Sequence, residues 1–190
     1  MAQEQPEREK IKREIEFSGQ AGVSVSFSGK TLVVRGPKGE VRRNFSNPFV
    51  AISVEGGKVL LESGPKKKPK AVIESSVAHI NNMLVGATKG FRYRLEIVQS
   101  HFPSKVTSSG GVVKIENFTG EKCPRLVKIE KGVRIKVEGK DVFLSGPDLE
   151  AVAKSAQKLE DGTKIRKKDR RTFQDGIYIM ERKLADEGAA

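Results

Sequence analysis

The sequence is poor in the residues that build disulfides, metal sites and membrane spans. Its 190 residues include one cysteine, Cys123, and two histidines. One thiol forms no internal disulfide, and this set is too small for a structural zinc site of the usual kind. The lone cysteine also fits a reducing cytosol. The chain contains no run of about 18 apolar residues, so we expect no transmembrane helix, and the charged residues 1–16 lack the apolar segment of a signal peptide.

Recognisable catalytic motifs are also missing. There is no G-x-S-x-G, H-E-x-x-H or Walker motif and no paired metal ligands. Cys123 and His101 could act as nucleophile and base, but the sequence offers no third group to orient them. We therefore predict no enzymatic activity, no cofactor, no metal and no small-molecule substrate. An enzyme acting on nucleic acid or an acidic substrate is the alternative, and an activity lost on changing His101 or Cys123 would support it.

Positive charge is abundant. Lysine and arginine number 36 against 24 acidic residues, giving a net charge of +12 and a pI near 9.8. Residues 17–90 carry +7 and residues 91–181 carry +6, whereas residues 1–16 carry −1. A chain that is basic in both halves is expected to bind a polyanion, with nucleic acid as the first candidate. An anionic membrane is the alternative, but no lipidation motif or lipid-facing apolar segment supports it.

The basic residues gather in three clusters, which are the candidate RNA-binding sites. Such side chains neutralise phosphates and release counterions, and arginine adds a planar fork that suits phosphate. The alternative for each cluster is an ordinary solvated surface. The clusters are Lys66, Lys67 and Lys68 on a loop bounded by prolines; Lys122, Arg125 and Lys128; and Lys164, Arg166, Lys167, Lys168, Arg170 and Arg171.

Residue patterns predict an α+β fold of two similar tandem domains, each an antiparallel sheet covered by one main helix. Alternating apolar residues predict strands at 23–27, 31–35, 40–45, 50–54 and 58–62, then a helix at 69–87. The second domain is expected to hold strands at 91–100, 112–117 and 126–129, a hairpin at 133–144, a helix from Asp148 to Gly162 and an apolar segment at 173–179. The predicted boundaries are a charged, solvated extension at 1–16, domains at 17–90 and 91–181, and a polar tail at 182–190.

An internal repeat favours two domains. Residues 23–37 align without a gap to residues 133–147, with five identical positions and five more that keep apolar character. Both segments follow the plan strand, Gly-Lys turn, strand, Gly-Pro stop. A second, weaker match sets Gly56–Glu62 against Gly110–Glu116, and the two matched hairpins then occur in opposite order along the chain. A separation of 110 residues is typical of a duplicated small domain and not of a solenoid.

Five short segments resemble one known family, the sixth universal protein of the large ribosomal subunit, in its archaeal and eukaryotic branch. They run in order over residues 17–181 and are Gly36-Pro-Lys-Gly39; His79-Ile-Asn-Asn-Met83 with Gly86-Ala-Thr-Lys-Gly-Phe91; His101-Phe-Pro103; Ile115-Glu-Asn-Phe-Thr-Gly-Glu-Lys122; and Asp169-Arg-Arg-Thr-Phe-Gln-Asp-Gly-Ile-Tyr178. Two features depart from the family pattern. The extension at 1–16 is longer than usual, and Thr119 stands where this branch often has leucine, so that loop is expected to pack differently.

The resemblance implies a non-enzymatic, cytoplasmic protein of two duplicated α+β domains. It implies binding to large-subunit rRNA near the factor-binding region, by the sarcin–ricin loop and the stalk base, among other large-subunit proteins that include those of the stalk base. In this family the second domain makes most of the RNA contacts. That role is carried over to the loop Asn117–Arg125 and the stretch Lys164–Tyr178, including Tyr178.

Overall fold

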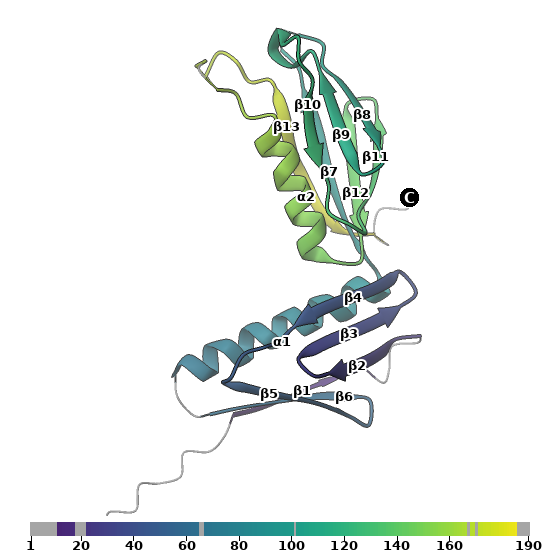
Figure 1. Cartoon of the computed structure of the whole chain (residues 1–190), viewed down its shortest axis with the longest axis vertical. Helices are drawn as coiled ribbons and strands as arrows, with labels where there is room; N and C mark the ends of the chain where they lie inside the picture. The colour runs from purple at the N-terminus through teal and green to yellow at the C-terminus, as the bar shows by residue number, and fades with distance from the viewer. Residues whose placement is uncertain are drawn as a thin grey trace, which may run out of the picture. The chain divides into compact units, whose positions relative to one another are not determined.

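The computed structural model of this chain describes residues 11–17, 22–64, 67–100, 102–166, 168–169 and 171–185. The chain divides into two compact units between Thr88 and Lys89 (Figure 1). Unit 1 contains β1 (Ile11–Glu16), β2 (Ser24–Ser28), β3 (Thr31–Gly36), β4 (Gly39–Asn44), β5 (Val50–Glu55), β6 (Lys58–Ser63) and α1 (Lys67–Thr88). Unit 2 contains β7 (Phe91–Val98), β8 (Lys105–Ser109), β9 (Val112–Glu116), a 3₁₀ turn at Phe118–Gly120, β10 (Arg125–Lys128), β11 (Arg134–Glu138), β12 (Asp141–Gly146), α2 (Leu149–Gly162) and β13 (Gly176–Leu184).

The predicted fold class is confirmed, with antiparallel strands and one long helix in each unit. Within the described residues of unit 1, the strands divide between two sheets, in the orders β1-β6-β5 and β2-β3-β4. Helix α1 contacts strands of both sheets, and apolar side chains from helix and sheets form one core.

The predicted Gly-Pro-Lys-Gly turn joins β3 to β4 and docks on the end of α1. A Cβ at Gly36 would lie 2.5 Å from the Ala87 carbonyl oxygen, so this close approach requires glycine.

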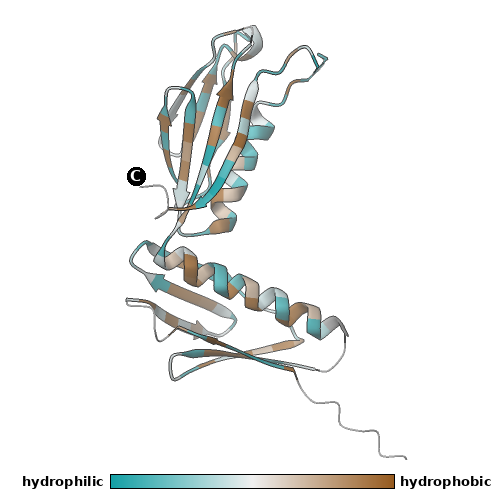
Figure 2. Ribbon diagram, turned by 180° about the vertical axis from the view of Figure 1, so that it is seen from behind, coloured by the Kyte–Doolittle hydropathy of each residue, from teal (hydrophilic) through white to brown (hydrophobic). Residues whose placement is uncertain are grey.

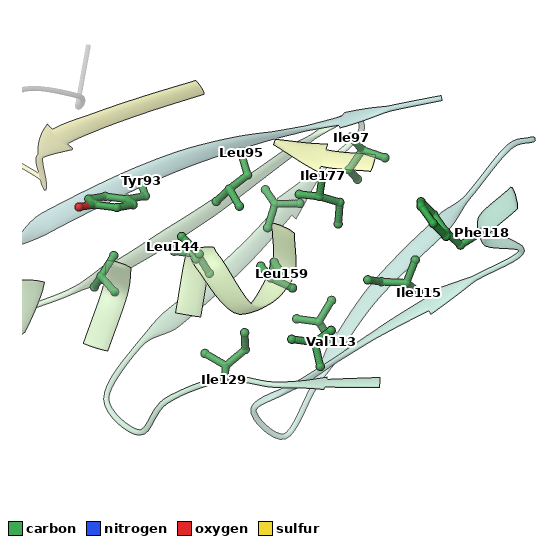
Figure 3. Close-up of a cluster of buried hydrophobic side chains, with 14 residues drawn as sticks. Tyr93, Leu95, Ile97, Val113, Ile115, Phe118, Ile129, Leu144, Leu159 and Ile177 are labelled. Carbon is green, nitrogen blue, oxygen red and sulfur yellow. The ribbon is translucent and has the colours of Figure 1, made fainter. Parts of the chain in front are cut away.

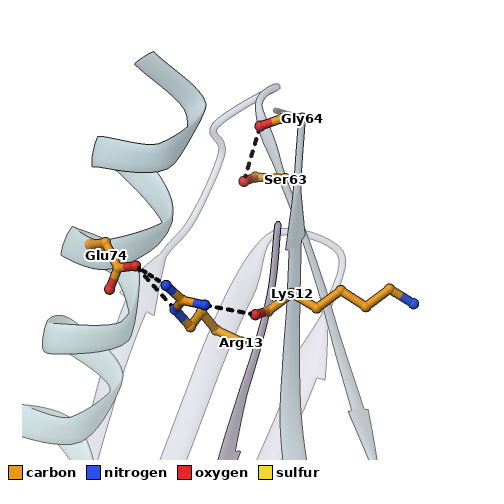
Figure 4. A network of polar contacts seen from close by, with 5 residues as sticks. All are labelled: Lys12, Arg13, Ser63, Gly64 and Glu74. Atoms are coloured by element: carbon orange, nitrogen blue, oxygen red, sulfur yellow. Dashed lines mark hydrogen bonds and ion pairs between the residues drawn. The ribbon is translucent and has the colours of Figure 1, made fainter. Parts of the chain in front are cut away.

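Strand β1 is the main difference from the expected fold of unit 1. Residues 11–16 are not a solvated extension, because they pair antiparallel with β6 and place Ile15 opposite Val59. Ile15 is only 8% exposed and belongs to the core. Arg13 points to the helix, where its Nε and Nη2 donate to Glu74 Oε1 at 3.0 and 2.7 Å (Figure 4). The sequence signal of this half-buried strand was weak, because Ile11 and Ile15 are its only apolar residues and a charged residue, Arg13, stands between them on the same face.

Unit 2 contains the same kinds of elements as unit 1, with one further strand and a 3₁₀ turn among the described residues. Its described strands form a three-stranded sheet β10-β9-β8 and a four-stranded sheet β11-β12-β7-β13, all antiparallel. Side chains from both sheets and from α2 meet in one core, where Leu159 lies between Leu144 of one sheet and Val113 of the other (Figure 3). Along the strands, hydrophobic and hydrophilic residues alternate (Figure 2). The sequence prediction missed β8 and ended the last strand at 179, whereas β13 continues to Leu184.

The order of elements in unit 1 recurs in unit 2 without rearrangement. Strand β6 pairs with β1 and β5, as β12 pairs with β7 and β11, and the sheet β2-β3-β4 corresponds to β8-β9-β10. Duplication is therefore confirmed, but the alignment of residues 23–37 with 133–147 is wrong, since it sets β2–β3 against β11–β12. The match of Gly56–Glu62 with Gly110–Glu116 is wrong for the same reason, and the reversed hairpin order disappears with both.

The correct equivalence was present in the sequence. Ile52–Leu61 aligns with Ile135–Leu144, with six identical residues out of ten. Gly56 and Gly139 begin the two hairpin turns with nearly the same left-handed φ, 57° and 59°. The wrong alignment arose because all four hairpins share apolar alternation and a turn that begins with glycine. Residues 23–37 and 133–147 also both end in Gly-Pro, although their hairpins belong to sheets that are not equivalent. Hairpin patterning alone does not identify which hairpin is which.

The position of Ile15 in the core gives a prediction for unit 1. Replacing Ile15 with alanine removes buried methyl groups and should lower the free energy of unfolding by about 2–4 kcal/mol. Replacing the neighbouring exposed Glu14 with alanine should change it by no more than about 0.5 kcal/mol. Urea denaturation followed by circular dichroism compares the two. A loss for Ile15→Ala as small as that for Glu14→Ala would show that β1 contributes little to the stability of the core.

Candidate nucleic-acid interface

The loop that follows β9 is held in a left-handed conformation. Asn117 and Thr119 have φ values of 54° and 50°, and both ψ values are close to 30°. Asparagine tolerates this region, whereas it is unusual for a β-branched residue such as threonine. Two contacts hold the loop in place: the Phe118 ring is buried, and Asn117 Nδ2 donates to the Pro103 carbonyl oxygen at 3.1 Å.

Arg125 ties this loop to the chain that leaves α2. Its Nε and Nη2 donate to the two Glu121 carboxylate oxygens at 2.8 and 2.5 Å. Its Nη1 donates to the carbonyl oxygens of Gly162 at 2.9 Å and Lys164 at 3.2 Å. The guanidinium also lies over the Phe118 ring, 4.4 Å from its centroid. The planar fork of arginine allows all these contacts at once, which a lysine ammonium could not reproduce.

The segment between α2 and β13 is anchored at both ends. At its start, the buried Thr163 hydroxyl accepts a hydrogen bond from the Ile177 backbone N–H at 2.9 Å. At its end, the buried Asp175 carboxylate accepts one from the Ser100 N–H. Between these anchors, the Asp169 carbonyl oxygen accepts from the Phe173 N–H at 2.9 Å and closes a turn. The segment therefore emerges from fixed points although its described residues have no regular secondary structure.

Aromatic rings connect the two segments. The Lys168 ammonium lies 4.6 Å from the Phe173 ring centroid and 6.0 Å from that of Phe102. The Phe102 ring packs on Gly120, where an added Cβ would be 3.3 Å from it. The hydrogen bond from Arg125 lowers the pKa of Glu121, and the charges of Arg125 and Lys168 lower it further. The loop 117–125 and the segment 163–175 thus lie together at one end of unit 2 (Figure 1).

The predicted RNA-binding residues fall in different environments. Those with exposed side chains at or near this end are Lys122, Lys164, Arg166, Lys168 and Arg171. Lys128 is exposed too, but it pairs with Val112 at the opposite end of β10. Tyr178 is half-buried, and its hydroxyl donates to the Gln174 carbonyl oxygen at 3.2 Å. Lys66, Lys167, Arg170 and His101 lie outside the described residues.

The first lysine cluster differs from its predicted loop. Lys67 and Lys68 begin helix α1 instead, two residues before the predicted helix start at Pro69. Proline is tolerated in a first helical turn because the N–H groups there have no partner within the helix. This cluster belongs to unit 1, so the structure brings the second and third clusters together and leaves the first apart.

Several residues that shape this end were not predicted from the sequence. They are Glu121, Phe102, Thr163 and Asp175. The partners of Phe102, Thr163 and Asp175 are distant in the chain and leave no local pattern, whereas Glu121 lies four residues before its partner Arg125. Phe91 and Tyr93, which alternate with charged residues along β7, are both buried. Cys123 is exposed on the same loop.

Among the described residues, no group of three His, Cys, Asp or Glu side chains is placed to hold a metal ion. In the same part of the chain, no helix has the length and apolar character to cross a membrane.

The sequence of this two-unit α+β chain matches a known class of ribosomal proteins. The sequence profile of the family "Ribosomal protein L6" matches residues 21–90 and 102–176, and the two matches begin just before the equivalent hairpins β2–β3 and β8–β9. This chain belongs to that family.

Similar curated proteins come from archaea, and each is named large ribosomal subunit protein uL6. The protein of Ignicoccus hospitalis is 47% identical over 169 residues, which cover 86% of this chain and 91% of that protein. The protein of Methanococcus vannielii is 43% identical over 90% of this chain and 94% of its own length. The protein of Saccharolobus solfataricus is 42% identical, with 93% and 97% covered.

The contacts of Arg125 give a stability prediction. Replacing it with alanine should lower the free energy of unfolding by about 2–3 kcal/mol, because hydrogen bonds to Glu121 and to two carbonyl oxygens are lost together. Replacing it with lysine should recover little of this, since the fork geometry is absent. Urea denaturation is the measurement, and Lys122→Ala on the same loop is the control with almost no expected change. A full rescue by lysine would contradict the role given to the fork.

Proposed function

We propose that this chain is a structural component of the large ribosomal subunit that binds rRNA through the end of unit 2. The observation that carries the proposal is the gathering of five exposed cations, Lys122, Lys164, Arg166, Lys168 and Arg171, on two segments that are anchored to the core and to each other. The family and the names of the archaeal relatives support the same role.

The binding mode follows from the chemistry of these side chains. Lysine and arginine at the surface neutralise phosphates and release counterions, and such contacts fix position without reading sequence. Segments that are already anchored lose little conformational freedom on binding. Folded RNA is recognised mainly through its shape and backbone, so we expect little sequence readout by this protein. In this scheme Arg125 holds the two loops in place, and its partners inside unit 2 leave it a minor role in phosphate contact.

The finer assignment rests on the family resemblance. We place the contact on large-subunit rRNA near the factor-binding region, by the sarcin–ricin loop and the stalk base, with other large-subunit proteins including those of the stalk base as neighbours. Lys167 and Arg170 are proposed as further phosphate contacts of the same segment. Lys66, Lys67, Lys68 and Lys128 are proposed as secondary contacts. The protein would act in the cytoplasm and support translation by holding RNA helices in place, without catalysis or a cofactor.

The first experiment is sedimentation of a native lysate through a sucrose gradient, with the protein followed by mass spectrometry. We expect one copy per large subunit, retained through a high-salt wash. A protein found only at the top of the gradient would contradict the proposal and would favour a free nucleic-acid-binding module.

A charge variant tests the interface itself. Replacing Lys122, Lys164, Arg166 and Arg171 with alanine should weaken binding to large-subunit rRNA and flatten the plot of log affinity against log salt by about 3 to 4 units of slope, one per lost phosphate contact. The fold should persist, because these side chains are exposed. Fluorescence anisotropy over a salt series is the measurement. An unchanged slope would exclude these four residues as phosphate contacts.

A further inference from the structure

A small cavity, called the end cavity below, lies where the end of α2 meets the start of β13 (Figure 1). Its volume is about 180 Å³, and its walls include Gln157, Glu160 and Asp161 from α2 and Tyr178 from β13. Pockets for drug-sized ligands measure about 300 to 1,000 Å³. The end cavity is smaller and suits one planar ring system.

The wall formed by α2 is acidic. Gln157, Glu160 and Asp161 are three and four residues apart, so their side chains lie on one face of the helix. Among the described residues, neither carboxylate forms an ion pair. The C-terminal end of a helix favours cations, yet the last turn of α2 contains no basic residue. Two unpaired acids at this position lower the stability of the helix, and a ligand that donates hydrogen bonds would compensate for that loss.

The wall formed by β13 is an aromatic ring that is held in place. The Tyr178 hydroxyl donates to the Gln174 carbonyl oxygen at 3.2 Å. The ring packs on Gly176, where an added Cβ would lie 3.1 Å from it. Tyr178 is half-buried, so part of its surface remains open to a ligand. A ring that is already fixed can stack on a nucleobase with little loss of conformational freedom.

The charges around the cavity select among the groups of an RNA. Glu160 and Asp161 repel phosphates, whereas Lys164, which also lines the cavity, attracts them. The hydrogen-bond donors of RNA are its base edges and its 2′-hydroxyls. Guanine places two N–H donors side by side on its Watson–Crick edge, and one carboxylate can accept both. Adenine and cytosine place an acceptor beside their amino group, and uracil has acceptors on both sides of its N–H.

We propose that the end cavity binds one guanine base that is unstacked from the rRNA. The base stacks on Tyr178, its two N–H groups donate to Glu160 or Asp161, and the Gln157 amide donates to its carbonyl oxygen. The phosphate beside this nucleotide contacts Lys164. The inference rests on the proposed function and adds one position of base readout to an interface that otherwise contacts the RNA backbone.

The test compares two single-stranded probes, short oligouridines that carry either one guanosine or one adenosine in the middle. The full chain is titrated with each by fluorescence anisotropy at low salt in the presence of EDTA. The cavity variant carries Glu160→Gln and Asp161→Asn. The control carries Glu14→Gln and Glu55→Gln, two exposed acids of unit 1, and so loses the same charge. The four-residue alanine variant of the loops is the fourth protein.

We expect the wild type to bind the guanosine probe at least about fivefold more tightly than the adenosine probe, as one bidentate pair allows. The cavity variant should bind both probes equally, whereas the control should keep the preference. The loop variant should lose affinity for both probes and keep their ratio. Urea denaturation should show the cavity variant to be at least as stable as the wild type, because it removes acids from a helix C-terminus. A lost preference is then not caused by unfolding.

Three results would overturn the end cavity as a guanine site. In the first, the wild type has no preference and the cavity variant binds both probes more tightly, which shows that the carboxylates only repel RNA. In the second, a preference appears only when Mg²⁺ replaces EDTA, which assigns the carboxylates to a hydrated cation. In the third, the wild type binds neither probe, which contradicts the RNA-binding end of unit 2 together with its cavity. The first two results leave the proposed function intact.

Discussion

The hydrogen bonds of Arg125 are the contact on which the candidate interface depends. One guanidinium joins the Glu121 carboxylate, the last residue of α2 and the residue two positions beyond it. Without this contact, the loop 117–125 and the segment 163–175 would be joined mainly by the packing of Phe102 and by Lys168. Cations on loops that move independently pay an entropy cost on binding that anchored ones avoid. A half-buried structural arginine thus makes the exposed cations more effective.

Comparison of the two units shows where the interface arose. Both units follow the same order of six strands and one helix, but only unit 2 continues beyond its helix into a segment and the strand β13 among the described residues. The candidate interface lies on that added segment and on the loop it covers. The addition to the duplicated fold therefore supplies most of the exposed cations of the candidate interface.

The sequence predicted the features that depend on local pattern. The helices, most strands and the basic clusters follow from apolar periodicity, from turn residues and from runs of like charge. Strand β1 was missed because four of its six residues are charged and only Ile11 and Ile15 are apolar. The repeat was misaligned because hairpins of different sheets share one pattern. Arg125 was grouped with the RNA-binding cations because its partners, Gly162 and Lys164, are 37 and 39 residues away.

The natural cysteine offers the most direct test of where the RNA lies. Cys123 is exposed on the loop 117–125, and it is the single cysteine of the sequence. An iron chelate attached to it in assembled large subunits generates hydroxyl radicals that cleave nearby RNA. The account predicts strong local cleavage of large-subunit rRNA from this position and weak cleavage from a cysteine placed at exposed Ser26 of unit 1 in a Cys123→Ser background. Cleavage from Cys123 no stronger than from position 26 would contradict it.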